Sequence, residues 1–195
     1  CIRDSFNVAD TERLLAAAAK YNLTPKTHVN QFNIIGGIQA SIKHGALSVD
    51  HLEVMNDADI EALQGTDCMP TLLPSCSFFL DIPYGPARKM IQAGLPVALA
   101  TDYNPGSSPN GNMNFVASLG CIQLKMTPEE VINATTINTA YAMGVSDKLG
   151  SIAIGKKANL FITKQIPSYA YLPYAFGHNQ ICLLYTSPSP RDGIG

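Results

Sequence analysis

The sequence lacks the features that mark nucleic-acid-binding and membrane proteins. Its 13 Lys and Arg against 15 Asp and Glu leave a formal net charge of −2, so no basic stripe is available to neutralise phosphates. No apolar run approaches the roughly 20 residues that a membrane helix needs, and the first residues contain no apolar signal core. We therefore expect a soluble, cytoplasmic protein that binds neither nucleic acid nor a membrane.

Cysteine pairs are missing as well. The five cysteines are scattered and never form a C-x-x-C pair, which argues against a disulfide framework and a thiolate zinc site. We expect buried thiols in a reducing compartment. Only 14% of the residues are charged and 46% are hydrophobic, which excludes disorder, collagen and coiled coil. The chain is expected to be globular and, because it begins at Cys1 rather than Met, to be part of a longer protein.

Short apolar segments alternate with amphipathic helices in the first half of the chain. The predicted strands start near residues 26, 47, 69 and 96, at separations of 21 to 27 residues. The predicted helices lie at 11–23, 34–45, 56–65 and 86–94, the first capped by Asp10 or Thr11. Apolar strands without strict alternation, each followed by one helix, are typical of a parallel sheet covered by helices. The sequence therefore predicts an α/β fold.

Polar side chains lie at the carboxyl ends of all four predicted strands. They are His28, Asp50 and His51, Ser75, and Thr101 and Asp102. Open doubly wound sheets bind ligands mainly at one switch point, whereas barrels draw catalytic groups from several strand ends at one face. Four such ends favour a barrel, but a closed TIM-type barrel has eight strands and about 250 residues. We therefore expect the carboxyl-terminal half of a (β/α)8 barrel.

The pattern changes beyond the fourth strand. Residues 111–126 are expected to form a helix, and Thr127, Pro128 and Glu130 carry the signature of a capped helix start. Short β-rich runs in 150–163 surround a turn at Gly155, which indicates a small sheet outside the barrel. Residues 183–195 lose all periodicity. The expected division is 1–145 for the barrel half, 146–181 for part of a small β-sandwich, and 182–195 for a non-native tail.

Each of the four histidines has a structural interpretation as a surface or core imidazole. His44 lies late on a predicted helix, just before Gly45, where a cation suits the helix dipole. His178 follows Gly177 in a loop. Neither receives a functional role.

His28 and His51 differ because a barrel brings their strand ends to the same rim as Asp102. Two imidazoles and a carboxylate suit zinc or ferrous iron, which favour nitrogen and carboxylate oxygen donors. A hydrolytic metal site is the natural hypothesis. The alternative is structural, with Asp102 capping the following turn through Asn104 and Pro105.

The Gly-containing loop at 102–112 matches neither common phosphate-binding motif. No Lys or Arg lies between Lys89 and Lys125, so a phosphate would depend on backbone amides alone. A neutral or carboxylate-bearing small molecule, oriented by Asn104, Ser107 and main-chain groups, fits better.

Four segments closely resemble the imidazolonepropionases, a family of metal-dependent amidohydrolases. They are THVNQFN at 27–33, GALSVDHLE at 45–53, LPSCSFFL at 73–80 and LATDYNPGSSP at 99–109. A fifth, GSIAIGKKANLFI at 150–162, resembles the wider superfamily, in which it returns the chain to a small β-sandwich. The resemblance covers about residues 1 to 180.

The resemblance implies hydrolytic opening of the ring of 4-imidazolone-5-propanoate, which gives N-formimidoyl-L-glutamate in histidine degradation, by a homodimeric enzyme. It implies that His28 and Asp102 bind Zn²⁺ or Fe²⁺/Fe³⁺, and that Asp102 also transfers a proton. His51 corresponds to a catalytic histidine beside the substrate carbonyl. The implied substrate contacts are Gln31, His51, Asn104, Gly106 and Ser107.

Two departures from the family pattern affect these expectations. Gln31 stands where many members have a glutamate, and an amide only donates and accepts hydrogen bonds at neutral pH, so Gln31 is expected to orient the ring. No two histidines are two residues apart, so the His-x-His of the superfamily is absent. His28 and Asp102 fall short of the three ligands usual for catalytic zinc, so the 195-residue chain alone is expected to bind metal weakly and be inactive.

Two other functions stay open from the sequence. Another amidohydrolase, such as a deaminase of a small nitrogen heterocycle, would use the same metal chemistry. A non-catalytic α/β domain would use the half-barrel as a binding surface, with His28 and Asp102 in structural roles.

Overall fold

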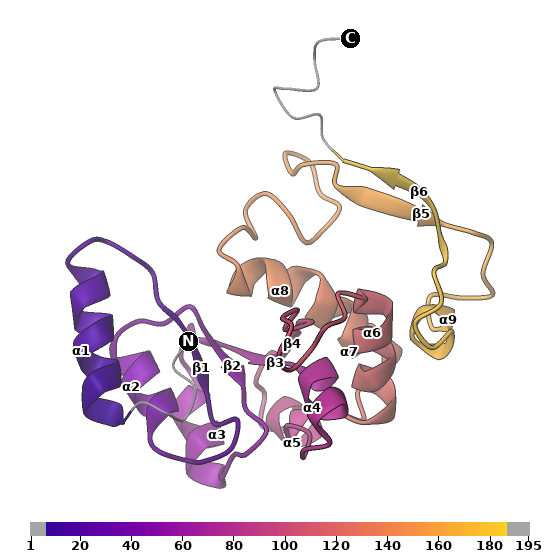
Figure 1. The fold of residues 1–195 in the computed structure, drawn as a ribbon. Helices are drawn as coiled ribbons and strands as arrows, with labels where there is room; N and C mark the ends of the chain where they lie inside the picture. Colours follow the sequence, from indigo (N-terminus) through magenta and orange to yellow (C-terminus); the bar gives the residue numbers. More distant parts are fainter. Residues whose placement is uncertain (1–6, 187–195) are drawn as a thin grey trace.

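The computed structural model describes residues 7–186, and its centre is a parallel four-stranded sheet (Figure 1). The strands are β1 (Lys26–Val29), β2 (Ser48–His51), β3 (Met69–Leu72) and β4 (Ala98–Leu99). Each strand pairs with the next one in the chain, in the order β1-β2-β3-β4. A doubly wound sheet would reverse its strand order at a switch point. The consecutive order agrees with the predicted half of a barrel.

Helices connect the strands and cover one face of the sheet. They are α2 (Gly37–Lys43), α3 (Asp57–Leu63) and α5 (Ala87–Gln92), whereas α4 (Pro74–Leu80), between β3 and α5, contributes no side chain to the core cluster. The side chains that pack against these helices include Val29, Val49, Leu72 and Leu99, all in one buried cluster. Burying one such side chain contributes about 1.5–3 kcal/mol relative to leaving it exposed. This core holds the strand ends in place.

The opposite face of the sheet is more polar and borders a cavity of about 250 Å³. Its lining includes Lys26, His28, Asp50 and Thr71. Helix α8 (Ile137–Ala142) lies above β3 and β4 in Figure 1, and its residues Thr139 and Ala142 line one side of this cavity. Lys26 Nζ donates a hydrogen bond to the carbonyl oxygen of Ala142 at 2.9 Å and so ties β1 to the end of α8.

Helix starts follow local capping chemistry. Helix α1 (Val8–Ala19) is capped by Asn7, whose side chain accepts from the Asp10 N–H, so the predicted caps at Asp10 and Thr11 are wrong. The helix begins a turn earlier because Asn7 is an equally good cap. Helix α7 (Pro128–Thr135) has the predicted capping box of Thr127 and Glu130.

The segment after β3 differs from the prediction. Ser75 was expected at a strand end but lies in α4, because Pro74 takes the first helical position and starts a helix there. The long helical stretch after the 102–112 loop is α6 (Met113–Ile122). The predicted fourth strand is only two residues long, and its chain continues as the loop that carries Asp102.

A separate two-stranded antiparallel sheet lies outside the α/β body (Figure 1). Strand β5 (Leu160–Thr163) was predicted, but its partner is β6 (Ile181–Tyr185) rather than the run before Gly155. Ile152 and Ile154, before that turn, are fully exposed, because no strand of the described chain covers them. A short helix, α9 (Tyr171–Tyr174), follows β5 and precedes β6 in the chain, and it packs against α6.

Residues 182–185, which were expected to belong to a non-native tail, form part of strand β6. The rest of that prediction, at 187–195, lies outside the described residues. Between residues 7 and 186, no helix is long and apolar enough to cross a bilayer.

Candidate functional site

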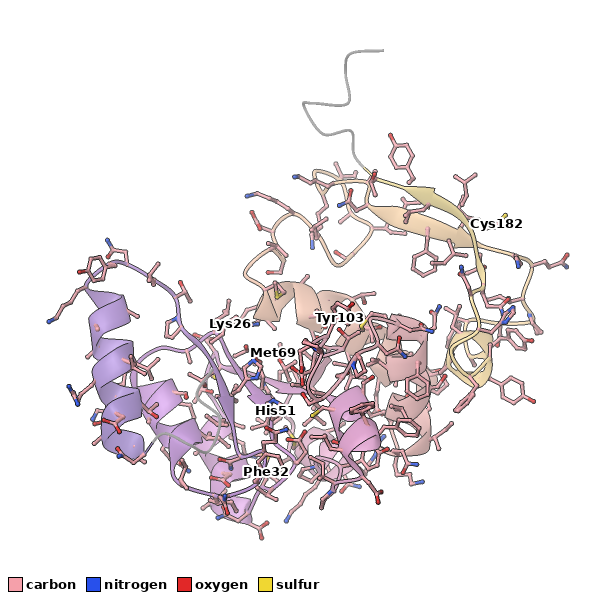
Figure 2. All side chains as sticks on the ribbon, in the orientation of Figure 1. Lys26, Phe32, His51, Met69, Tyr103 and Cys182 are labelled. Carbon is pink, nitrogen blue, oxygen red and sulfur yellow. The ribbon has the colours of Figure 1, made fainter. Side chains whose placement is uncertain are left out.

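Three predicted site residues meet at the carboxyl ends of the central strands. One potential ligand atom from each of His28, His51 and Asp102 lies within 4.8 Å of the others. His28 belongs to β1, His51 ends β2, and Asp102 follows β4. Figure 2 shows His51 inside the α/β body, well away from Cys182 on the two-stranded sheet. The expected common rim is confirmed.

The backbone at His51 adopts a conformation that few residues other than glycine take. Its φ is 87°, and that of Leu52 is 65°. Successive strand residues point to opposite faces, so regular alternation would put Asp50 and His51 on different sides of the sheet. The left-handed turn accounts for the His51 ring lying beside His28 instead. Such a conformation costs about 1–3 kcal/mol and is typical of functional sites.

Each of the two imidazoles leaves one nitrogen without a partner. His28 Nδ1 and His51 Nε2 are buried and have no hydrogen-bond partner in the described structure. The other nitrogens face carboxylates: His28 Nε2 lies 3.6 Å from Asp50 Oδ2, and His51 Nδ1 lies 3.2 Å from Glu53 Oε1. Metal-binding histidines commonly show this arrangement, with one nitrogen on the metal and the other on a carboxylate. The residues present therefore fit a zinc or iron ion.

The two imidazoles have opposite protonation tendencies. Burial lowers the pKa of His28 below its ordinary value, against the opposing effect of Asp50, which favours the neutral ring that binds metals. Burial also acts to lower the pKa of His51, but hydrogen bonding with Cys76 and Glu53 and the charges of Glu53 and Asp102 raise it to about 9. A protonated His51 is a hydrogen-bond donor, so the two rings suit different tasks.

Asp102 starts a loop that its neighbours organise. Asn104 Nδ2 donates to the Asp102 carbonyl oxygen at 2.6 Å, and Asn104 Oδ1 accepts from the N–H groups of Gly106 and Ser107 at 2.9 and 2.8 Å. Ser107 Oγ donates to Asp102 Oδ2 at 3.3 Å. Asn104, rather than Asp102, therefore caps this turn, which leaves the Asp102 carboxylate directed at the histidines.

Gln31 reaches the site through a buried cysteine. Its Nε2 donates to Cys76 Sγ at 3.3 Å, and its Oε1 is buried without a partner among the described residues. Cys76, His51 and Glu53 form a second group with potential ligand atoms within 4.8 Å of one another. In this second group His51 Nδ1 already contacts Glu53, so we interpret the group as a set of hydrogen bonds that positions the His51 ring rather than as a metal site.

Sequence reasoning placed Asp50 at a strand end without giving it a role, and it missed Glu53 and Cys76 as members of the site. All three lie inside segments 45–53 and 73–80 that carry the family resemblance, and that was the available signal. Their contacts depend on the turn at His51 and on α4, which strand patterning does not reveal. Cys76 is fully buried as expected of the cysteines, whereas Cys182 is exposed.

The remaining histidines lie away from this cluster. His44 is the carboxyl-terminal cap of α2, as expected, and its Nε2 is buried. His178 follows α9.

Comparison with known sequences identifies similar proteins across nearly the whole chain. The sequence model of the Amidohydrolase family matches residues 5–181. The imidazolonepropionase of Christiangramia forsetii is 63% identical over 185 residues, which cover 95% of this chain and 45% of that protein. That of Flavobacterium johnsoniae is 65% identical over 181 residues, covering 93% of this chain and 44% of that protein. The chain thus spans slightly less than half the length of these relatives.

Solved structures share the fold at low sequence identity. An adenosine deaminase from Xanthomonas campestris with bound zinc superposes with a TM-score of 0.76 at 19% identity, over 92% of this chain and 48% of that one. Escherichia coli guanine deaminase superposes with a TM-score of 0.71 at 15% identity, over 90% of this chain and 50% of that one. At these identities the similarity concerns the fold alone.

Proposed function

Because this chain belongs to the amidohydrolase family, we propose that it is the carboxyl-terminal half of an imidazolonepropionase, which hydrolyses 4-imidazolone-5-propanoate to N-formimidoyl-L-glutamate. The observation that carries the proposal is the convergence of His28, His51 and Asp102 in a chain 63–65% identical to imidazolonepropionases. The proposed division is a barrel half at 1–145 and part of a β-sandwich at 146–181.

The metal site of the proposal uses His28 and Asp102 as ligands for zinc or iron. A bound metal of this kind lowers the pKa of a water molecule from 15.7 to about 7 and so supplies the nucleophile at neutral pH. Catalytic zinc usually has three protein ligands, so the remaining ligands are proposed to come from a His-x-His segment elsewhere in the parent protein. The unpartnered Nδ1 of His28 supports its role as a ligand.

The proton transfers of the proposal use Asp102. Its carboxylate accepts a proton from the attacking water as the water oxygen bonds to the ring carbonyl carbon. Asp102 then returns the proton to the ring nitrogen as the C–N bond breaks. General acid–base catalysis of this kind is typically worth about 100- to 10,000-fold in rate. The Ser107 hydroxyl, 3.3 Å from Asp102 Oδ2, supports the role, because it places a hydrogen-bond donor beside the carboxylate.

His51 is proposed to stabilise the oxyanion that develops on the ring carbonyl. Its Nε2 has no partner in the described chain, and donation from that nitrogen would compensate the charge. Gln31 is proposed to orient the ring: its Nε2 is committed to Cys76, which leaves Oε1 to accept from a ring N–H. The loop at Asn104, Gly106 and Ser107 is proposed to hold the rest of the substrate.

A chimera tests the proposal. Residues 5–181 of this chain replace the matched segment of the Flavobacterium johnsoniae relative, whose 65% identity makes the packing compatible. We expect the zinc-loaded chimera to hydrolyse 4-imidazolone-5-propanoate, with the unaltered relative as positive control. Turnover of cyclic ureas or aminopyrimidines in its place would favour another amidohydrolase. Absence of a metal site in a folded chimera would favour a non-catalytic domain.

The proposal also extends to assembly and location. Following the family resemblance, the parent protein is proposed to be a cytoplasmic homodimer. Light scattering of the purified parent protein tests the dimer.

A further inference from the structure

We propose that Asp50 and Glu53 are positioning residues that each hold one imidazole of the site, Asp50 for His28 and Glu53 for His51. This inference rests on the proposed function, because it concerns how the two rings are aimed at metal and substrate. One short segment, Asp50-His51-Leu52-Glu53, thereby supplies a carboxylate to each histidine.

Glu53 is a buried carboxylate with no cationic side chain of Lys or Arg among its contacts in residues 7–186. Its side chain is 1% exposed, and its Oε1 contacts His51 Nδ1 at 3.2 Å and accepts from Ser77 Oγ at 3.4 Å. Its Oε2 has no partner in the same part of the chain. Removing a carboxylate from water without a partner is expensive, so the imidazole is its main compensation. A residue that served only to fill this space would not need the charge.

Asp50 has the same relationship to His28 across the sheet. The two residues are register partners of β2 and β1, so their side chains lie on the same face. Asp50 Oδ2 lies 3.6 Å from His28 Nε2, and Asp50 Oδ1 accepts from Ser48 Oγ at 2.7 Å. The hydroxyl of Ser48 thus orients the carboxylate, and the carboxylate favours a proton on His28 Nε2. The opposite nitrogen, Nδ1, is then the one with a lone pair for a metal.

The backbone of this segment explains how two nearby carboxylates reach different rings. Asp50 is still in the strand, and its side chain borders the cavity beside His28. The left-handed residues His51 and Leu52 then reverse the chain, and Glu53 comes to lie behind the His51 ring. The strain at His51 is therefore what separates the two carboxylates. Because Gln31 is neutral, Glu53 is the carboxylate in hydrogen-bond contact with His51, and Asp102 is the other carboxylate near the ring.

The two positions predict different defects in the chimera. Replacing Glu53 by Gln keeps the size and removes the charge, so we expect kcat to fall about 10- to 100-fold, with KM within about twofold and zinc affinity unchanged. Replacing Asp50 by Asn should weaken zinc binding about 10- to 100-fold, measured by competition with a chromophoric chelator. At saturating zinc, the kcat of Asp50→Asn should recover to within a few-fold of the parent. The matched controls, Glu61→Gln and Asp67→Asn, remove exposed carboxylates and should change neither quantity.

Several outcomes would overturn the inference. An unchanged kcat in Glu53→Gln would show that the charge is not needed, and loss of zinc with that substitution would make Glu53 a ligand or a folding residue instead. If Glu53→Gln does not fold, Ser77→Ala, which removes only the hydroxyl donor to Glu53, should lower kcat about 2- to 10-fold, and no change would count against the inference. Unchanged zinc affinity in Asp50→Asn would refute the role of Asp50. The zinc measurement separates this inference from the proposed function. It decides the role of Asp50 even if the parent chimera does not hydrolyse 4-imidazolone-5-propanoate.

Discussion

The imidazole rings of His28 and His51 contact each other edge to face, with centroids 4.9 Å apart and planes inclined by 65°. They come from neighbouring strands, and the contact requires the left-handed backbone at His51. Their pKa values shift in opposite directions: burial, with a smaller contribution from the His51 charge, lowers the pKa of His28, whereas, against the effect of burial, hydrogen bonding with Cys76 and Glu53 raises that of His51 to about 9. His28 is therefore suited to bind a metal through a neutral ring nitrogen, and His51 is suited to donate a hydrogen bond, as the proposed chemistry needs.

Asp102→Asn should abolish most of the turnover of the chimera. The amide cannot accept the proton from water, so we expect kcat to fall by about 100- to 10,000-fold. Steady-state assays at saturating zinc measure this, and Asp147→Asn, an exposed carboxylate on a distant loop, is the control. Turnover at the parent rate in Asp102→Asn would refute the assignment.

Gln31→Met should affect substrate binding more than the chemical step. Met has nearly the same volume but offers the ring no strong hydrogen bond, and one neutral hydrogen bond is worth about 0.5–1.5 kcal/mol. We expect KM to rise about 2- to 10-fold while kcat changes less. A kcat defect as large as that of Asp102→Asn would instead make Gln31 part of the proton transfer.

The isolated chain should bind zinc far more weakly than the chimera. His28 and Asp102 are two ligands, and because even changes in the surroundings of ligands cost about 10- to 100-fold in affinity, we expect a difference of more than about 100-fold. Chelator competition on both proteins measures the ratio. Stoichiometric zinc in the isolated chain, together with ring hydrolysis, would contradict the expectation.

Glu130→Gln should reduce stability in a pH-dependent way. The Arg88 hydrogen bond and charge hold the pKa of Glu130 below its ordinary value, while the capping bond to Thr127 N–H survives in Gln. A carboxylate whose pKa is lower in the folded state stabilises the fold above the unfolded-state pKa of about 4.3. This stabilisation is lost as the pH falls through the folded-state pKa.

Because Arg88 and Glu130 are partly exposed, we expect a loss of only about 0.5–1 kcal/mol at pH 7, with the two proteins converging below about pH 4. Urea unfolding of the chimera and its variant at several pH values measures this. A constant difference across the pH range would show that the effect is not the charge.

Local sequence patterns determined the α/β alternation, the parallel sheet and the placement of His28, His51 and Asp102 at strand ends. They succeed because strand periodicity and helix caps such as Thr127 and Glu130 act over a few residues. The pairing of β5 with β6 and the contacts of Glu53 with His51 were decided only in the tertiary structure. Those features depend on left-handed backbone and on segments distant in the chain, where packing rather than local preference selects the conformation.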